Sequence, residues 1–142
     1  NIILKPGRLT SEEAEIMKSH TSKGCEMLDG IKSYISKEYW SAAYDICRYH
    51  HEKYDGHGYP YGVSGESIPL SAQIVSVADV YDGLVSERIY KKAKQKSRAF
   101  EMIVTGECGV FAPRVIESFR KCRSEFEALV DQTGMELAED DN

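Results

Sequence analysis

The sequence has no long apolar run and no closely spaced cysteine pair. No stretch approaches the roughly 18 consecutive apolar residues that a membrane-spanning helix needs, and no signal-peptide pattern is present. The four cysteines, Cys25, Cys47, Cys108 and Cys122, form no Cys-x-x-Cys motif. This spacing favours free thiols in a reducing compartment over a disulfide framework. We therefore expect a cytoplasmic domain without a membrane span.

The chain also lacks an overall excess of positive charge. Its 18 basic and 23 acidic residues give a net charge of −5, which argues against binding to a nucleic-acid polymer. An anionic ligand would therefore need a local basic patch. Segment 88–98 is a candidate, because it contains six lysines and arginines and no acidic residue. Such a run is usually a solvated surface, but it can also attract phosphate.

The length allows one sizeable hydrophobic core. With 142 residues, 42% of them hydrophobic, a single domain is expected. We predict this domain at 1–135, followed by an acidic tail at 136–142. The chain opens with Asn-Ile-Ile-Leu rather than methionine, so we expect it to start within a larger protein.

No strand pattern is evident, and apolar residues recur with helical spacing, which predicts an all-α domain. Thr10 and Glu13 form a capping-box pattern at the start of the first helix. Asp29-Gly30 is expected to end a short second helix. The predicted helices cover about 10–19, 24–28, 37–52, 70–86, 97–104 and the region from Pro113 onward.

Two of these helices have faces that predict their burial. In the helix after Pro69 a single face carries Leu70, Ile74, Val77, Ala78, Tyr81 and Leu84, so this helix is expected to be central in the core. In the 37–52 helix Tyr39, Ala43 and Ile46 share a face with His50. This places His50 on the predicted core side.

Chemistry-bearing residues concentrate in the segment 50–60. His50 and His51 lie there with two carboxylates, those of Glu52 and Asp55, and this set of residues suits divalent metals. A histidine hydrogen-bonded in the core is the alternative for His50. Asp79 and Asp82 lie three residues apart on one helix, either around a cation or as a solvated acidic edge or a capping aspartate. The residues alone leave both choices open.

The order of these motifs resembles the HD-GYP family. It includes His20 at a helix end, then His-His-Glu-Lys-Tyr-Asp-Gly-His-Gly-Tyr-Pro at 50–60, Ala-Asp-Val-Tyr-Asp at 78–82 and Arg-Ile-Tyr-Lys at 88–91. This resemblance covers about 5–119. It implies a helical bundle of the HD superfamily and a bacterial signalling phosphodiesterase that hydrolyses cyclic di-GMP to pGpG and GMP.

The resemblance also implies roles for individual residues. His20, His50, His51 and Asp79 match metal ligands, and Asp79, His50 and His51 thereby match the catalytic centre. Gly58, Tyr59, Pro60, Arg88 and Lys91 match positions beside the cyclic dinucleotide. The family's cofactor is iron or manganese in a cluster of two or three ions.

The chain departs from the family pattern in several places. The His-Asp pair that names the superfamily would precede Asn1, so the bundle is expected to be incomplete at its N-terminus. Without this aspartate the metal cluster is expected to be incomplete as well, so the chain itself should hold metal poorly and show little activity. Gln73 replaces a common arginine and Ala112 a common aspartate. Two alternatives therefore stay open: a dinucleotide receptor without catalysis, and a module that docks a diguanylate cyclase or a sensor or receiver domain. Self-association into a homo-oligomer is also expected.

Overall fold

The structure, a computed structural model, describes all residues except 1, 4, 87–92 and 131–142, and within this part it contains helices and no strand. This confirms the all-α prediction. The helices are α1 (Ser11–Lys18), α2 (His20–Ile31), α3 (Lys37–Tyr49), α4 (Leu70–Val85), α5 (Lys96–Val104) and α6 (Pro113–Lys121), with 3₁₀ turns η1 (Lys32–Tyr34) and η2 (Gly65–Ser67). Residues 123–130 are also helical.

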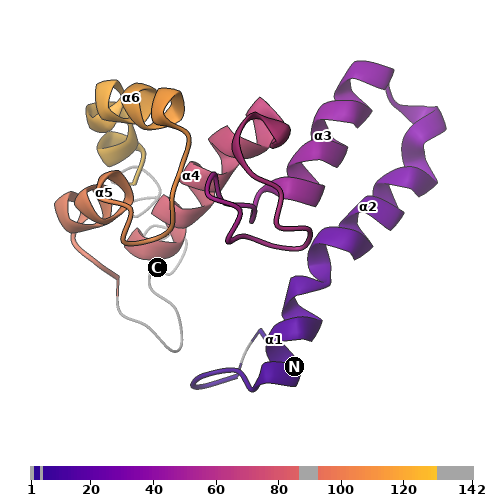
Figure 1. Cartoon of the computed structure of the whole chain (residues 1–142), viewed down its shortest axis with the longest axis horizontal. Coiled ribbons are helices and arrows are strands. Elements are labelled where there is room, and N and C mark those ends of the chain that lie inside the picture. Colours follow the sequence, from indigo (N-terminus) through magenta and orange to yellow (C-terminus); the bar gives the residue numbers. More distant parts are fainter. Residues whose placement is uncertain (1, 4, 87–92, 131–142) are drawn as a thin grey trace, which may run out of the picture.

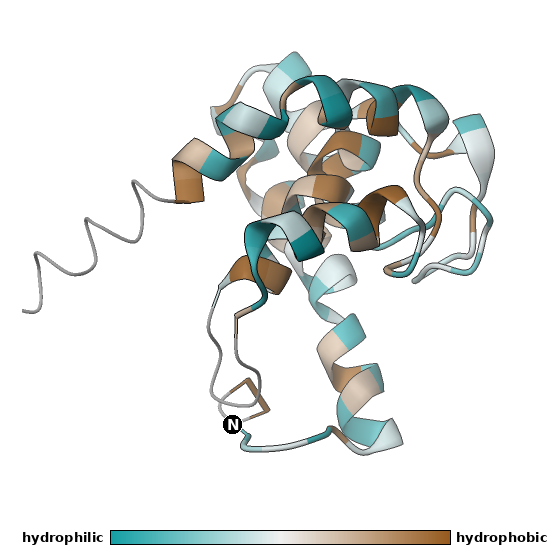
Figure 2. Cartoon of the chain, turned by 90° about the vertical axis from the view of Figure 1, so that its left-hand side faces the viewer, coloured by the Kyte–Doolittle hydropathy of each residue, from teal (hydrophilic) through white to brown (hydrophobic). Residues whose placement is uncertain are grey.

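The helices form two groups joined by α4. Figure 1 shows α2 and α3 side by side as a hairpin, with α5 and α6 packed together on the opposite side of α4. Figure 2 shows hydrophobic residues gathered where the helices face one another. None of the helices in the described ranges combines the length and apolarity that a bilayer span requires.

The predicted capping box at the start of α1 is confirmed. The Glu13 backbone N–H donates to Thr10 Oγ1 at 3.2 Å, and the Thr10 N–H donates to Glu13 Oε2 at 2.8 Å. Lys5 also pairs with Glu13, with Nζ 2.6 Å from Oε2. These contacts tie the N-terminal segment to the first turn of α1.

The second helix is longer than predicted. It runs from His20 to Ile31, so Asp29-Gly30 does not end it and Gly24 lies in its interior. A Cβ at Gly24 would overlap Cys47 Sγ on α3. The glycine therefore marks a close contact between two helices, a tertiary feature that a local pattern of helix breakers does not reveal.

A Gly24→Ala variant tests this contact. We expect its free energy of unfolding to fall by about 1–3 kcal/mol, because overpacking outweighs the roughly 1 kcal/mol gained in helix propensity. Cys47→Ala removes the overlapping sulfur. In that background, Gly24→Ala should instead stabilise the chain by up to about 1 kcal/mol. Urea unfolding of the wild type, the two single variants and the double variant measures the sign of the Gly24→Ala effect in each background. Equal effects in the two backgrounds would contradict the close contact.

The third helix ends earlier than predicted. It stops at Tyr49, with His50 as its C-cap, because the chain turns sharply and the Glu52 N–H donates to Tyr49 O at 2.9 Å. The predicted core face of this helix is also partly wrong, since Tyr39 is 70% exposed. Trp40 is instead the aromatic that joins the hairpin, because its Nε1–H donates to Leu28 O at 3.0 Å.

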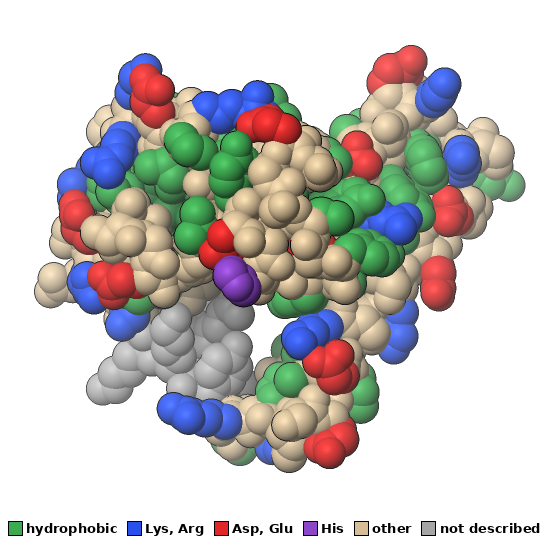
Figure 3. Space-filling model, in the orientation of Figure 1, with side chains coloured by type: hydrophobic (Ala, Val, Ile, Leu, Met, Phe, Trp, Pro, Cys, Tyr) green, Lys and Arg blue, Asp and Glu red, His purple; other side chains and the backbone are tan. Residues whose placement is uncertain are grey.

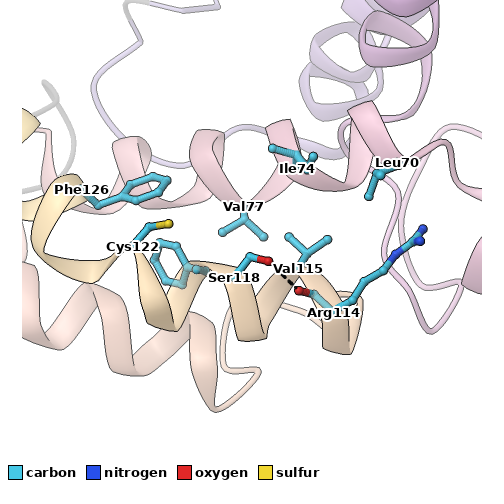
Figure 4. Close-up of a pocket in the computed structure, with 9 residues that line it drawn as sticks. Leu70, Ile74, Val77, Arg114, Val115, Ser118, Cys122 and Phe126 are labelled. Atoms are coloured by element: carbon cyan, nitrogen blue, oxygen red, sulfur yellow. Dashed lines mark hydrogen bonds between the residues drawn. The ribbon is translucent and has the colours of Figure 1, made fainter.

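The main hydrophobic core lies between α4, α5 and α6. Val77, Tyr81 and Leu84 are buried there as predicted. Leu70 and Ile74 are 46% and 53% exposed, so the expected burial of the whole face is wrong for the first turns of α4. These turns border an apolar groove of about 360 Å³ between α4 and α6, which Figure 4 shows. The remaining core residues are Ala99, Phe100, Ile103, Phe111, Ala112, Val115 and Phe119.

Candidate metal centre

Three imidazoles meet where the α2–α3 hairpin opens. His20 is the first residue of α2, His50 caps α3, and His51 follows it. Because the hairpin is antiparallel, the start of α2 lies beside the end of α3, although His20 and His50 are 30 residues apart in sequence. One ligand atom from each histidine lies within 4.8 Å of the others. This is the convergence of histidines that a metal site requires.

The backbone contacts of two histidines define their tautomers. His20 Nδ1 lies 2.8 Å from Met17 O, and His50 Nδ1 lies 2.9 Å from Ile46 O. A carbonyl oxygen only accepts hydrogen bonds, so each Nδ1 acts as the donor, and the Nε2 atom of a neutral ring then presents a lone pair. The two Nε2 atoms are 3.2 Å apart. Two lone pairs at this distance repel unless a cation or a proton lies between them, and a carbonyl-anchored imidazole is the usual form of a metal ligand.

His51 is in the protonation state that a metal ligand needs. Its side chain is 23% exposed and its ring stacks on Tyr59, with centroids 4.7 Å apart. Burial lowers the pKa of His51 to about 3, and the neighbouring His50 and His20 rings act in the same sense. Asp79 Oδ2, 3.9 Å from Nδ1, would favour the charged form, but burial dominates. The imidazole is therefore neutral at pH 7.

This shift predicts how the stability of the metal-free chain depends on pH. The unfolded chain protonates His51 below its ordinary pKa of about 6.5, whereas the folded chain does so only near a pKa of about 3. The stabilising contribution is thus complete above pH 6.5 and is lost as the pH falls toward 3. We expect His51→Leu to flatten this part of the stability curve in urea unfolding. An unchanged slope would contradict a buried, neutral His51.

The two aspartates of α4 have different surroundings. Asp79, 45% exposed in its side chain, lies with Oδ2 3.9 Å from His51 Nδ1 and lines the same cleft, but it is outside the group of three histidines whose ligand atoms lie within 4.8 Å of one another. Asp82 Oδ1 instead accepts a hydrogen bond from Oγ of Ser86, the C-cap of α4, at 3.0 Å, and the Ser86 backbone N–H donates to Asp82 O at 2.9 Å. The observed contact of Asp82 is therefore local to the end of α4, and it does not place Asp82 at the histidine cluster.

The loop that carries Gly58, Tyr59 and Pro60, called the signature loop from here on, folds back on the chain that precedes it. A Cβ at Gly58 would overlap backbone atoms of Glu52 and Lys53, so glycine is needed here for close packing. Tyr59 follows and lines the cleft, and the Tyr59–Pro60 peptide bond is cis. His57 points away from the histidine cluster, with its ring 3.1 Å from Asp55 and its side chain 86% exposed.

An open cleft of about 790 Å³ lies in front of the histidines. His20, His51 and Asp79 line one part of it, and the N-terminal segment lines another, with Lys5 and Arg8. Figure 3 shows the open space on this face, above the N-terminal segment at the bottom of the view. Sequence reasoning missed these two basic residues, because their separation from the motif gives no local signal.

Lys53 is a second residue that sequence reasoning left without a role. Burial lowers its pKa, while Asp79 acts in the opposite direction. Its ammonium donates to Ser76 Oγ at 3.3 Å and lies 4.4 Å from the centroid of the Phe111 ring. The sequence signal that could have pointed to Lys53 is its position inside the histidine-rich motif at 50–60. Arg88 and Lys91, the expected basic contacts, lie outside the described residues.

The fold and this cluster define a helical domain with a histidine site suited to a divalent metal. The sequence profile of the HD domain family matches residues 1–110, and the chain belongs to that family. This agrees with the resemblance inferred from the motifs.

Three relatives carry names that refer to one substrate. A cyclic di-GMP phosphodiesterase of Vibrio cholerae is 40% identical over 130 residues, which are 91% of this chain and 26% of the relative. The cyclic di-GMP phosphodiesterase response regulator RpfG of Xanthomonas campestris is 39% identical over 93% of this chain and 34% of its own length. A cyclic di-GMP phosphodiesterase of Thermotoga maritima is 43% identical over 87% of this chain and 33% of its own length. The chain thus spans about a quarter to a third of these relatives.

Proposed function

We propose that this chain supplies metal ligands and part of the substrate cleft of a cyclic di-GMP phosphodiesterase. The observation that carries the proposal is the 3.2 Å separation of His20 Nε2 and His50 Nε2, with each Nδ1 held on a backbone carbonyl. The names of the relatives support cyclic di-GMP as the substrate of the whole protein.

The proposed metal ligands are His20, His50, His51 and Asp79. Imidazoles with a carboxylate suit iron or manganese, the metals that the family resemblance implies. A bound metal would supply an activated water and an electrophile for a phosphate oxygen. Because His51 is neutral, its lone pair is available without the prior loss of a proton. The carboxylate of Asp79 would offset part of the positive charge.

Other residues of the cleft would hold the substrate. Burial, together with the nearby Asp79, raises the pKa of Tyr59 to about 12, so its phenol stays protonated and can donate a hydrogen bond to a phosphate. Lys5 and Arg8 lie on the N-terminal part of the cleft, where they would attract the negative charge of the substrate. The cleft volume is within the range of small-molecule sites. The expected products are pGpG and then GMP.

The test compares this chain with the full-length parent protein. Each is supplied anaerobically with Fe²⁺ or with Mn²⁺, and cyclic di-GMP, pGpG and GMP are separated by liquid chromatography. We expect turnover by the parent, weaker metal binding by the chain than by the parent, and little turnover by the chain alone. A parent protein that binds either metal but cleaves no cyclic dinucleotide, including a mixed guanine–adenine one, would refute the enzymatic proposal.

Binding without hydrolysis is the second candidate. One observation favours it: Asp79 is the only carboxylate among the described residues that line the cleft. One carboxylate offsets less charge than a cluster of two or three divalent ions needs. Calorimetry that shows cyclic di-GMP binding to the parent protein, with no product in the same sample, would support this receptor function.

We also propose that the parent protein associates with itself or with a signalling domain. Ile16 of α1, together with Met27 and Ile31 of α2, is 46–76% exposed, which is the kind of apolar surface that partners cover. A diguanylate cyclase, a sensor domain or a receiver domain are the proposed alternatives to a second copy. Light scattering of the parent, alone and with each domain, distinguishes a homo-oligomer from these complexes.

A further inference from the structure

Glu52 is a buried acidic residue directly beside the metal centre. It follows His51 in sequence and is only 2% exposed. Burial of a carboxylate is unfavourable unless hydrogen bonds compensate for the lost hydration. Gly58, further along the chain, packs directly on the Glu52 backbone. The two carboxylate oxygens of Glu52 have different surroundings.

The first oxygen holds the loop. Glu52 Oε1 accepts a hydrogen bond from the Tyr61 backbone N–H at 2.7 Å. Two residues earlier, the Tyr59 N–H donates to His51 O at 3.3 Å, and the Tyr59 ring stacks on the His51 ring. The bond to Glu52 thus fixes the turn that places an aromatic ring on a candidate metal ligand.

The second oxygen belongs to a residue that borders a small, partly open space. Glu52 Oε2 and Gln73 Oε1 are both buried and have no hydrogen-bond partner among the described residues. Both residues line a space of about 10 Å³, together with Ser76. Gln73 Nε2 donates to Ile68 O at 2.6 Å, which orients the amide oxygen as the free group. Two acceptors that face one space need a donor with two hydrogens, and this volume is about that of one water molecule.

We propose that Glu52 is a positioning residue, which holds Tyr59 on His51 through Tyr61 and is itself anchored to α4 by one buried water shared with Gln73. Its importance for catalysis rests on the proposed function. The positioning itself does not, because it can be measured in the metal-free chain.

The experiment uses nuclear magnetic resonance of the metal-free chain with labelled histidines. A stacked aromatic ring shifts the His51 ring protons upfield, and Tyr59→Leu gives their unstacked position. We expect Glu52→Ala to move the His51 signals toward that position, with no further change in the Glu52→Ala/Tyr59→Leu double variant. Glu52→Gln should keep them near the wild type, because its amide oxygen can accept from Tyr61 N–H and its NH₂ can donate to the water shared with Gln73 Oε1. Glu66→Gln, an exposed acid at the end of the same loop, is the matched control and should move nothing.

Three results would overturn the positioning role. The first is a His51 signal that stays at its wild-type position in Glu52→Ala. The second is a general loss of dispersed signals in Glu52→Ala, which would assign Glu52 to global stability instead. The third is a Glu52→Gln variant that behaves like Glu52→Ala. A crystal structure of the chain without an ordered water between Glu52 and Gln73 would overturn the proposed anchor.

The parent protein gives a second readout. If the parent hydrolyses cyclic di-GMP, Glu52→Ala is expected to raise KM several-fold more than it lowers kcat, because Tyr59 lines the cleft whereas His20 and His50 keep their own backbone contacts. Absence of turnover in the wild-type parent would refute the proposed function but would leave the resonance result unaffected.

Discussion

His50→Ala is expected to weaken Mn²⁺ binding by the chain by roughly a hundredfold or more. Loss of a residue that only supports a metal ligand already costs about 10–100-fold in affinity, and His50 is proposed as a ligand itself. Its Nε2 lies 3.2 Å from His20 Nε2, so its removal also deprives His20 of the neighbouring ligand atom. Isothermal titration of the metal-free chain with Mn²⁺ measures the change.

His57→Ala is the matched control for this result. His57 lies in the loop that follows His50 and His51, but its side chain is 86% exposed and pairs with Asp55, away from the cluster. The His57→Ala variant should bind Mn²⁺ with the affinity of the wild type. Circular dichroism should show equal helix content in both variants, because His50 is the C-cap of α3 and the turns before it keep their own hydrogen bonds. Wild-type affinity in His50→Ala would contradict the proposed metal centre.

Phe119→Ala is expected to lower the free energy of unfolding by about 3–5 kcal/mol, the usual cost of deleting a buried aromatic side chain. Phe119 is 3% exposed, and its ring stacks on Phe100 with centroids 4.9 Å apart. It also contacts the rings of Tyr81 and Phe126 at 5.7 and 5.0 Å. One side chain thus joins α4, α5, α6 and the helical residues 123–130. A loss of this size is a large part of the stability of a typical domain.

Urea unfolding of the metal-free chain measures this loss. Tyr39→Ala is the control, because it also deletes an aromatic ring but from a position that is 70% exposed. Its effect should stay within about 0.5 kcal/mol. Equal effects of the two variants would show that the core is not organised around Phe119.

The metal centre and the core are on different parts of the same helix. Asp79 faces the histidines, whereas Val77 and Tyr81, two residues away on either side, are buried against α5 and α6. This alternation follows from the helical period, which turns successive residues by about 100°. α4 therefore positions the carboxylate of the site through the packing of its opposite face. Substitutions such as Phe119→Ala can in this way disturb the site without touching it.

Local sequence patterns predict the features that depend on nearby residues. The capping box of Thr10 and Glu13, the helix start at Pro113 and the buried positions Val77, Tyr81 and Leu84 are all confirmed. Each depends on contacts or periodicity within a few turns of one helix. The same patterns fail where a distant segment decides the outcome.

Such distant contacts explain the errors in the hairpin. The local pattern predicts that Gly24 begins a short helix, but its packing against Cys47 places it in the middle of a long one. Periodicity also predicts that Tyr39 is in the core because it shares a face with Ile46, yet no neighbouring helix in the described part buries it. Periodicity shows which residues share a face, and only tertiary packing decides which part of that face is covered.

The sequence by itself determined the helical class and the residue types of the candidate site, since both are written in local spacing and side-chain chemistry. Only the tertiary structure decided that His20 and His50 present their Nε2 atoms to each other at 3.2 Å, and that Glu52 holds the loop beneath Tyr59. The physical reason is that these distances depend on how α2, α3 and the loop pack together. That packing is a balance of contacts between residues far apart in the chain, which no short motif encodes.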